Sequence, residues 1–474
     1  RYVEKHDPSP ARWHHVQPQA VIFKYREGPQ YFQSVFTTGL PVPPTLSGMA
    51  EVTLDPQGRL LRFSNVPSPA GQTAALAPDW APLFRLAGLD PTRFTLAEST
   101  WIPPTAFDTQ VAWIGTEADQ PAMPLRVEAA ARQGRAIYFE IVYPWTLPAQ
   151  SESSQNPFSF PSLVGIAVLF FWIVGALIAR LNNRRGRGDR PGAFKLSCLM
   201  FALQLLFWVL AIQYVPVPRR LLNDLIFVVV LSQFYAVTIW LSYFALEPYV
   251  RRYWPNAIIS WSRVVTGHWR DALVGRDVLV GLLGGISLFL LSSLISYLTG
   301  HSNELAPKIN APSLLPALLG MRGASGSFFT VLSVTILNTF SLIFLLFLCR
   351  ALLRRQWLAA VIFILILMLG QPQASYQPAV SLPLLVIYLV IMVILTLRYG
   401  LVALLAAQLA KCFLEAFPLT LNFSAWYAGT GMLGLLAVLG LAIWAFYTSL
   451  GGQKVFAGKL LNGASAATLP VEQP

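Results

Sequence analysis

The segment from Pro161 to Arg190 constrains this chain more than any other part of the sequence. It reads PSLVGIAVLFFWIVGALIARLNNRRGRGDR, with no charged residue before Arg180 and four further arginines after it. A hydrocarbon core about 30 Å thick is crossed by about 20 apolar helical residues. Arginine and lysine beside such a span indicate its cytoplasmic end. The segment therefore predicts a membrane span that separates a water-exposed region from a membrane-embedded region.

The composition supports a largely membrane-embedded chain. Its 474 residues are 55% hydrophobic and 12% charged, whereas soluble domains carry about 25% charged residues. The formal net charge of +12 raises the question of nucleic-acid binding. The basic residues lie beside apolar stretches, however, where they act as topology signals and contact anionic headgroups. We therefore expect the lipid bilayer as a partner and no nucleic acid.

Apolar stretches after the outer region predict about nine membrane-spanning helices in an all-α polytopic domain. They lie near 160–179, 194–213, 225–246, 278–298, 328–348, 357–369, 382–397, 401–417 and 428–450. The sequence leaves open whether the short stretches 357–369 and 401–417 cross fully. Basic residues concentrate in alternate loops, and Arg219 and Arg220 go against this alternation. The pattern predicts residues 1–156 outside the cell and the C-terminus in the cytoplasm.

The first 156 residues are typical of a small α+β domain. Residues 51–67 and 125–142 each alternate apolar and polar side chains around a turn, which predicts two hairpins. Residues 79–88 predict a helix with Asp79 as its N-cap. The predicted organisation is an extracytoplasmic α+β domain over 1–156, a helical membrane domain over 157–450 and a cytoplasmic tail over 451–474. Because residue 1 is Arg and no secretory segment precedes this domain, we expect a signal peptide or a further span upstream.

The loop from Glu247 to Asp277 is the most distinctive part of the membrane region. It interleaves tryptophans and arginines, which suits an amphipathic segment in the headgroup layer. Docking of a cytoplasmic domain or of anionic lipid is the alternative interpretation. The candidate residues of this cytoplasmic interfacial loop are Arg251, Arg252, Trp254, Trp261, Arg263, Trp269 and Arg270.

Lys411 and Glu415 lie inside the predicted span 401–417, four residues apart on one helix face. They are a candidate intramembrane ion pair. Ionisable groups in a membrane helix suggest function by default, but a structural pair is the favoured interpretation.

No pattern in the sequence predicts catalytic, cofactor-binding or metal-binding residues. The three cysteines, Cys198, Cys349 and Cys412, show no metal-ligand spacing. Residues 275–279, GRDVL, faintly match a kinase catalytic loop, but an apolar residue replaces the metal-binding Asn. Whether the chain belongs to an enzyme therefore stays open.

Several segments resemble those of a known family. The loop EPYVRRYWPNAIISWSRVVTGHWRDALVGRDVLVG resembles the membrane-anchored C-terminal regions of bacterial serine/threonine protein kinases, especially those of acidobacteria. VTLDPQGRLLRFSNVP, WAPLFRLAGLD and LRVEAAARQGRAIYFEIVYPW are similar to their extracytoplasmic segments. The resemblance implies a sensing and anchoring region of a signalling protein in the bacterial inner membrane. It also implies a cytoplasmic kinase domain, upstream of Arg1 or on a separate polypeptide.

Two other functions were weighed from the residues. A multispan transporter or channel with an outer accessory domain would need polar groups at midplane on several helices. An intramembrane enzyme would need clustered Asp, His or Glu at membrane depth, and it ranks last. The sequence names neither a ligand nor an oligomeric state.

Overall fold

A computed structural model divides the chain into two compact units, Arg1–Ser159 and Phe160–Pro474. It describes residues 22–29, 46–67, 77–103, 105–117, 120–143, 160–211, 217–302, 317–318, 320–369, 378–424 and 427–452. Most of the predicted tail, residues 453–474, lies outside the described residues. We call the two parts the sheet unit and the helical unit.

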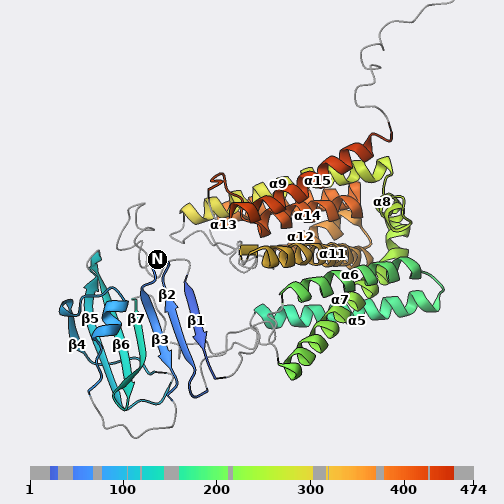
Figure 1. The fold of residues 1–474 in the computed structure, drawn as a ribbon. Coiled ribbons are helices and arrows are strands. Elements are labelled where there is room, and N and C mark those ends of the chain that lie inside the picture. The colour runs from blue at the N-terminus through green and yellow to red at the C-terminus, as the bar shows by residue number, and fades with distance from the viewer. Residues whose placement is uncertain are drawn as a thin grey trace, which may run out of the picture. The chain divides into compact units, whose positions relative to one another are not determined.

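The sheet unit contains a seven-stranded antiparallel sheet with the strand order β1-β2-β3-β7-β6-β5-β4 (Figure 1). Both predicted hairpins are confirmed, as β2–β3 and β6–β7. The sequence did not predict β1, β4 and β5. The strands are β1 (Phe23–Glu27), β2 (Ala50–Leu54), β3 (Leu60–Asn65), β4 (Phe94–Ala97), β5 (Thr109–Glu117), β6 (Gln120–Arg132) and β7 (Arg135–Val142).

One face of the sheet is apolar and packs against helix α4 (Ala81–Leu86). Phe84 of α4 is buried, and its ring meets Trp113 edge-on at 5.2 Å and Phe139 at 5.7 Å between centroids. Such aromatic pairs add about 0.5–1.5 kcal/mol beyond the burial of their area. The core of this unit therefore lies between one helix and one face of the sheet.

The predicted helix over 79–88 is present but shorter. It begins after Trp80, which is its N-cap, while Asp79 only accepts a hydrogen bond from the Ala81 backbone N–H at 3.0 Å. Gly88 follows with a φ of 70°, in the left-handed region, and it ends the helix as expected. The prediction of Asp79 as N-cap was therefore wrong by one residue.

The helical unit is a bundle of apolar helices (Figure 1). One short helix, α8 (Pro255–Val265), lies between the long helices α7 (Pro218–Tyr253) and α9 (Ala272–Ser302). The helices are α5 (Phe160–Arg184), α6 (Arg190–Ala211), α7 (Pro218–Tyr253), α8 (Pro255–Val265), α9 (Ala272–Ser302), α11 (Gly320–Leu353), α12 (Gln356–Leu369), α13 (Pro378–Ile394), the π-helix η4 (Leu395–Tyr399), α14 (Leu401–Ala416) and α15 (Ala428–Ser449).

The prediction of nine membrane spans is not supported. Among the described residues, six helices are long and apolar enough to cross a bilayer: α6, α7, α9, α11, α13 with η4, and α15. Helices α12 and α14 have 14 and 16 residues, so at about 1.5 Å per residue they fall short of a core about 30 Å thick. Side chains of α5 are described only from Leu169. The chain is a multi-pass membrane protein by these six helices.

Helices α9 and α14 pack at close range along the centre of this unit. A Cβ on Gly281 would lie 2.3 Å from the Ala403 carbonyl oxygen, and one on Gly285 would lie 2.2 Å from that of Ala407. Small residues of this kind let two helix backbones approach in a membrane. The two contacts advance in the same direction along both helices, so α9 and α14 run parallel.

Candidate functional site

The predicted interfacial loop folds into the junction between α7, α8 and α9. Helix α7 ends at Tyr253, Trp254 caps it, and Pro255 opens α8. Proline suits a first helical turn, because a backbone N–H at that position would have no intrahelical acceptor. The junction thus turns the chain between two long apolar helices without a long loop.

Helix α8 is amphipathic, and its apolar face lies inside the protein. Ile258, Ser260 and Trp261 are buried, and Ile259 is exposed. The Trp261 ring lies 5.4 Å from Phe340 of α11 and 6.2 Å from Tyr243 of α7, between centroids. Trp261 is therefore a core residue of the helical unit, and the prediction of this ring as a headgroup contact was wrong.

The other two tryptophans of the junction differ in exposure. Trp254 is half-buried and packs beside Leu346 and Phe363. Trp269 is exposed, and the Arg270 guanidinium lies 5.9 Å from its ring centroid. Of the predicted aromatic residues, Trp269 is the one whose exposure suits a headgroup contact.

Several arginines at the junction are held by carboxylates. Arg251 pairs with Glu247, Arg263 pairs with Asp271, and Arg276 Nη2 lies 2.8 Å from Asp277 Oδ1. Glu247 and Asp277 are both buried, so each arginine neutralises a carboxylate that burial would otherwise penalise. Ser260 donates a further hydrogen bond to Asp277 and so ties α8 to α9.

Asp271 lies directly before the first residue of α9. Its carboxylate accepts the Leu273 backbone N–H at 2.9 Å and pairs with Arg263. The hydrogen bond from Leu273, followed by the charge and hydrogen bond of Arg263, lowers the pKa of Asp271 below its ordinary value. A carboxylate at this position also interacts favourably with the helix dipole.

The turns that carry basic residues meet at α8. Lys195 Nζ at the start of α6 donates to the Val265 carbonyl at 3.4 Å, and Arg350 at the end of α11 lies over the Tyr253 ring. A Cβ on Gly400, before α14, would lie 2.4 Å from the Ala257 carbonyl oxygen. We call this part of the helical unit the α8 end. Which side of a membrane this end faces stays a prediction of the charge pattern.

A polar cluster that the sequence did not predict joins the α5–α6 turn to α7. Tyr243 Oη donates to Asp189 Oδ2 at 3.0 Å, and Asp189 Oδ1 accepts the Gly192 backbone N–H at 2.9 Å. Asn182 Nδ2 donates to the carbonyls of Phe244 and Ala245 at 3.2 and 3.1 Å. The Asp-Arg-Pro sequence from residue 189 is a helix-start pattern, and it was the available sequence signal for this cluster.

Lys411 and Glu415 lie in a second polar cluster among three helices. Lys411 Nζ is 2.8 Å from Glu415 Oε2 on α14, and Ser292 of α9 donates to Glu415 Oε1 at 3.1 Å. The ammonium also lies 5.9 Å from the Tyr388 ring centroid of α13. The lysine is thus held by a carboxylate and an aromatic face, which together offset its removal from water.

The second face of the sheet unit is polar and partly buried. Glu128 is buried and accepts hydrogen bonds from Ser99 and, at 2.6 Å, from Arg126 Nε. The Arg62 guanidinium lies 5.6 Å from the Tyr138 ring centroid, and Tyr138 donates to Glu140. Buried polar groups of this kind require partners, so this face is a network of charges and hydroxyls rather than a solvated surface.

Two buried hydroxyls on this polar face have no hydrogen-bond partner among the described residues. Thr53 and Ser64 are both buried, and within the described part of the chain neither hydroxyl has a hydrogen-bond partner, nor does Arg62 Nε. Thr53 lies opposite Arg62 across the β2–β3 ladder, and Ser64 lies two residues along the same face. An unpaired buried hydroxyl costs about 1–3 kcal/mol. These three groups are therefore the buried polar atoms of this face whose hydrogen-bonding capacity is unused in the described structure.

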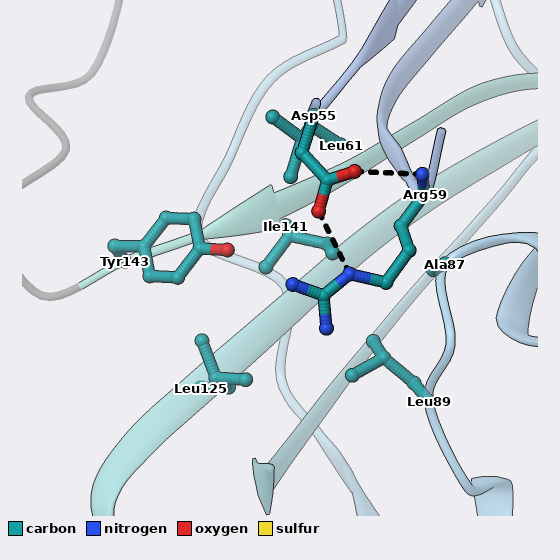
Figure 2. Close-up of a pocket in the computed structure, with 8 residues that line it drawn as sticks. All are labelled: Asp55, Arg59, Leu61, Ala87, Leu89, Leu125, Ile141 and Tyr143. Carbon is teal, nitrogen blue, oxygen red and sulfur yellow. Dashed lines mark hydrogen bonds and ion pairs between the residues drawn. The ribbon is translucent and has the colours of Figure 1, made fainter. Parts of the chain in front are cut away.

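A small cavity lies on the opposite, apolar side. Figure 2 shows Asp55 and Arg59 at its edge, with Tyr143 and the leucines around it. Arg59 Nε lies 2.7 Å from Asp55 Oδ2, and its backbone N–H donates to Asp55 Oδ1 at 2.8 Å. The cavity has a volume of about 10 Å³, which holds about one water molecule. It is too small for an organic ligand.

Metal-binding geometry is absent from the described part of the chain, where no three His, Cys, Asp or Glu side chains come together. Cys198, Cys349 and Cys412 are all free thiols. Comparison with protein-family models, with curated proteins and with solved structures finds no match to this chain. Functional inference therefore rests on the residues and their geometry.

Proposed function

We propose that this chain is the sensing and anchoring region of a bacterial inner-membrane signalling protein, with a serine/threonine kinase as its cytoplasmic effector. In this proposal the sheet unit lies outside the cell and binds a polar ligand. The α8 end lies in the cytoplasm and contacts the effector. The family resemblance of the loop 247–281 supports the kinase assignment, and no residue of this chain takes a catalytic role.

The observation that carries the sensing role is the incomplete polar face of the sheet unit. Among the described residues, the hydroxyls of Thr53 and Ser64 and the Nε of Arg62 have no hydrogen-bond partner, and all three lie on one face of the sheet. A ligand that pairs with them is favoured, because the protein has already lost the hydration of these groups. Binding would then favour one arrangement of the outer and membrane parts over another, and so bias the effector.

The coding sequence upstream of Arg1 and the neighbouring genes test the kinase assignment. A kinase domain fused to the chain or encoded beside it supports the proposal. An unrelated gene directly upstream with no kinase nearby contradicts it.

Accessibility labelling tests the orientation. In a chain whose cysteines are replaced by alanine, we expect Gln57→Cys to react with an impermeant maleimide in intact spheroplasts. We expect Arg187→Cys to react only after permeabilisation. Both positions are exposed turns. The reverse pattern would place the sheet unit inside the cell and remove the sensing role.

The ligand site has its own test. Thr53→Val with Ser64→Ala removes both unpaired hydroxyls while keeping their shapes, and it should raise the stability of the sheet unit. In a signalling assay it should abolish the response to the stimulus. A double variant that signals normally would show that these groups bind no ligand.

A transporter or channel is the second candidate, and the cluster around Lys411 favours it. Polar groups from α9, α13 and α14 meet there. Lys411 and Glu415 already pair with each other, however. A transport site needs groups that can exchange such a partner for the transported solute. Lys411→Ala with Glu415→Ala in a liposome flux assay tests it, and flux that depends on the pair would favour transport.

A further inference from the structure

A tight turn at the α8 end holds an arginine in an unusual backbone conformation. Helix α11 ends at Leu353 and α12 begins at Gln356, so Arg354 and Arg355 alone connect them. Arg354 has a φ of 56°. Among the described residues only Gln133 is a second non-glycine residue with positive φ. Glycine is the usual residue after a helix in this conformation, so an arginine there indicates a use for its side chain.

Two further arginines share one aromatic ring next to this turn. The guanidiniums of Arg252 and Arg350 lie 5.8 and 6.0 Å from the centroid of Tyr253. Arg350 also donates to the Arg354 carbonyl and so holds the turn against the end of α7. Arg252 and Arg350 thus meet at one ring from two segments that are distant in the sequence, and the turn with Arg354 and Arg355 directly follows α11. We call these four residues the α11-turn arginines.

These arginines differ from their neighbours in having no carboxylate partner among the described residues. Arg251, Arg263 and Arg276 each form an ion pair. In the part of the chain that the structure describes, none of the α11-turn arginines does. Several cations close together without a counter-charge repel one another. An anion placed between them would therefore bind favourably, and guanidinium matches the geometry of a phosphate.

The surroundings indicate where that anion comes from. Leu352 and Trp357 beside the turn are 80% and 61% exposed, and Tyr253 is 44% exposed. All three lie at the ends of apolar helices. Exposed apolar and aromatic side chains beside arginines at a helix end are typical of the boundary between acyl chains and headgroups. A soluble acidic partner would leave this apolar surface in water.

We propose that the α11-turn arginines form a binding site for the headgroup phosphate of an anionic phospholipid, with Leu352 and Trp357 against its acyl chains. This site is independent of the proposed kinase and of the ligand of the sheet unit. It would hold the ends of α7, α11 and α12 at one depth in the membrane. A site with two or more guanidiniums also distinguishes anionic lipids from zwitterionic ones.

The site can be tested on the full chain in detergent, with bound lipids counted by native mass spectrometry. We expect phosphatidylglycerol to bind more tightly than phosphatidylcholine. Arg252→Gln with Arg355→Gln should weaken phosphatidylglycerol binding about 25-fold, at about fivefold per arginine near an anionic lipid. The control, Arg185→Gln with Arg187→Gln, removes the same charge from another exposed turn at this end and should change binding less than about twofold.

The variant Arg354→Gly separates an effect on lipid binding from an effect on the stability of the fold. Glycine suits the left-handed conformation, so this variant should keep or raise the thermal midpoint. It should nevertheless weaken phosphatidylglycerol binding about fivefold. A lower midpoint with unchanged lipid binding would show that Arg354 serves the fold, and it would overturn the proposal.

Other arms identify the source of the anion. An excess of inorganic phosphate should leave most of the lipid bound, because the acyl chains add to the affinity. Full displacement by phosphate would indicate a free-anion site, and equal losses in the test and control variants would indicate bulk charge. Binding of an acidic peptide with the same dependence on these arginines would indicate a protein partner. Full displacement by phosphate, equal losses in the two variants, or such peptide binding would each overturn the proposal.

Discussion

The two units of this chain solve the same problem, the placement of charged side chains, in different ways. In the sheet unit, charged and hydroxyl groups occupy one face from β1 to β6, from Arg26 and Glu51 to Glu128. In the helical unit they gather at the ends of the helices, above all at the α8 end, and Lys411 is held by a partner within the bundle. One unit separates polar from apolar across a sheet, and the other separates them along its helices.

The difference follows from the surroundings of each unit. A strand alternates its side chains between two faces, so a sheet with one apolar face places every second residue on the other. A helix in lipid is apolar on all sides over the membrane core, so its charges move to the ends or pair internally. Carboxylates at the α8 end neutralise some arginines. We propose that the α11-turn arginines bind the phosphate of a lipid headgroup instead.

The largest effect is expected in the core of the sheet unit. Phe139→Ala removes a fully buried ring that contacts Phe84, and it should destabilise this unit by about 3–5 kcal/mol. Hydrogen exchange of the full chain should show lost protection in β7 and unchanged protection in α9. Leu96→Ala, at a position 75% exposed, is the control and should change stability by less than about 0.5 kcal/mol. Simultaneous loss of protection in α9 would show that the two units unfold as one.

The helical unit should be most sensitive where α9 meets α14. Gly285→Leu forces a side chain into the backbone of Ala407, and we expect a loss of about 1–3 kcal/mol or more. The thermal midpoint in detergent measures it. Gly440→Leu is the matched control, because a Cβ there meets nothing within 4 Å. Equal effects of the two variants would contradict the close packing of these helices.

The ion pair within the bundle should respond unequally to single and double changes. Glu415→Gln leaves the Lys411 ammonium without its carboxylate and should cost about 2 kcal/mol, because both side chains are only partly buried. Replacing both residues by Met should cost less, since no unpaired charge remains. Thermal midpoints of the single and double variants decide this. If the double variant were the less stable one, the pair itself would stabilise the bundle.

The smallest effect concerns the polar face of the sheet at high pH. Burial, followed by the nearby Glu140 carboxylate, raises the pKa of Tyr138 above its ordinary value. The folded state therefore holds this proton more tightly, so stability is complete below about pH 10 and falls as the pH rises further. Unfolding of the sheet unit followed by urea at increasing pH should show this loss.

Tyr138→Phe should remove that part of the pH dependence. It should also lower stability near neutral pH by about 1–3 kcal/mol, because the Trp101 ring N–H and Glu140 lose their partner. An identical alkaline profile in the variant and the wild type would show that another group titrates.

Several elements could be predicted because their signal is local. The hairpins β2–β3 and β6–β7 follow from alternation around short turns, and the apolar stretch 328–348 lies within α11, Gly320–Leu353. Strand β1, by contrast, reads FKYRE and is mostly exposed, so it carries no alternation of burial that a sequence pattern could show. The bounds of α14, Leu401–Ala416, lie within one residue of the predicted stretch 401–417, because the apolar run itself ends there.

The candidate sites depend still more on long-range contacts. The sequence singled out all the arginines of the junction as one class, yet the structure divides them by whether a carboxylate reaches them. It singled out Trp261 as a headgroup residue, and the structure buries this ring against Phe340. It did not associate Arg252 with Arg350, because their segments are far apart along the chain.

By itself, the amino-acid sequence determined the division into an α+β region and an apolar helical region, because hydropathy and side-chain periodicity are properties of neighbouring residues. It also determined which turns carry the basic residues. Only the tertiary structure decided how many helices are long enough to cross, which arginines find carboxylates and which buried hydroxyls find none. Those outcomes depend on distances between segments that are remote along the chain, and such distances arise only when the helices and strands pack.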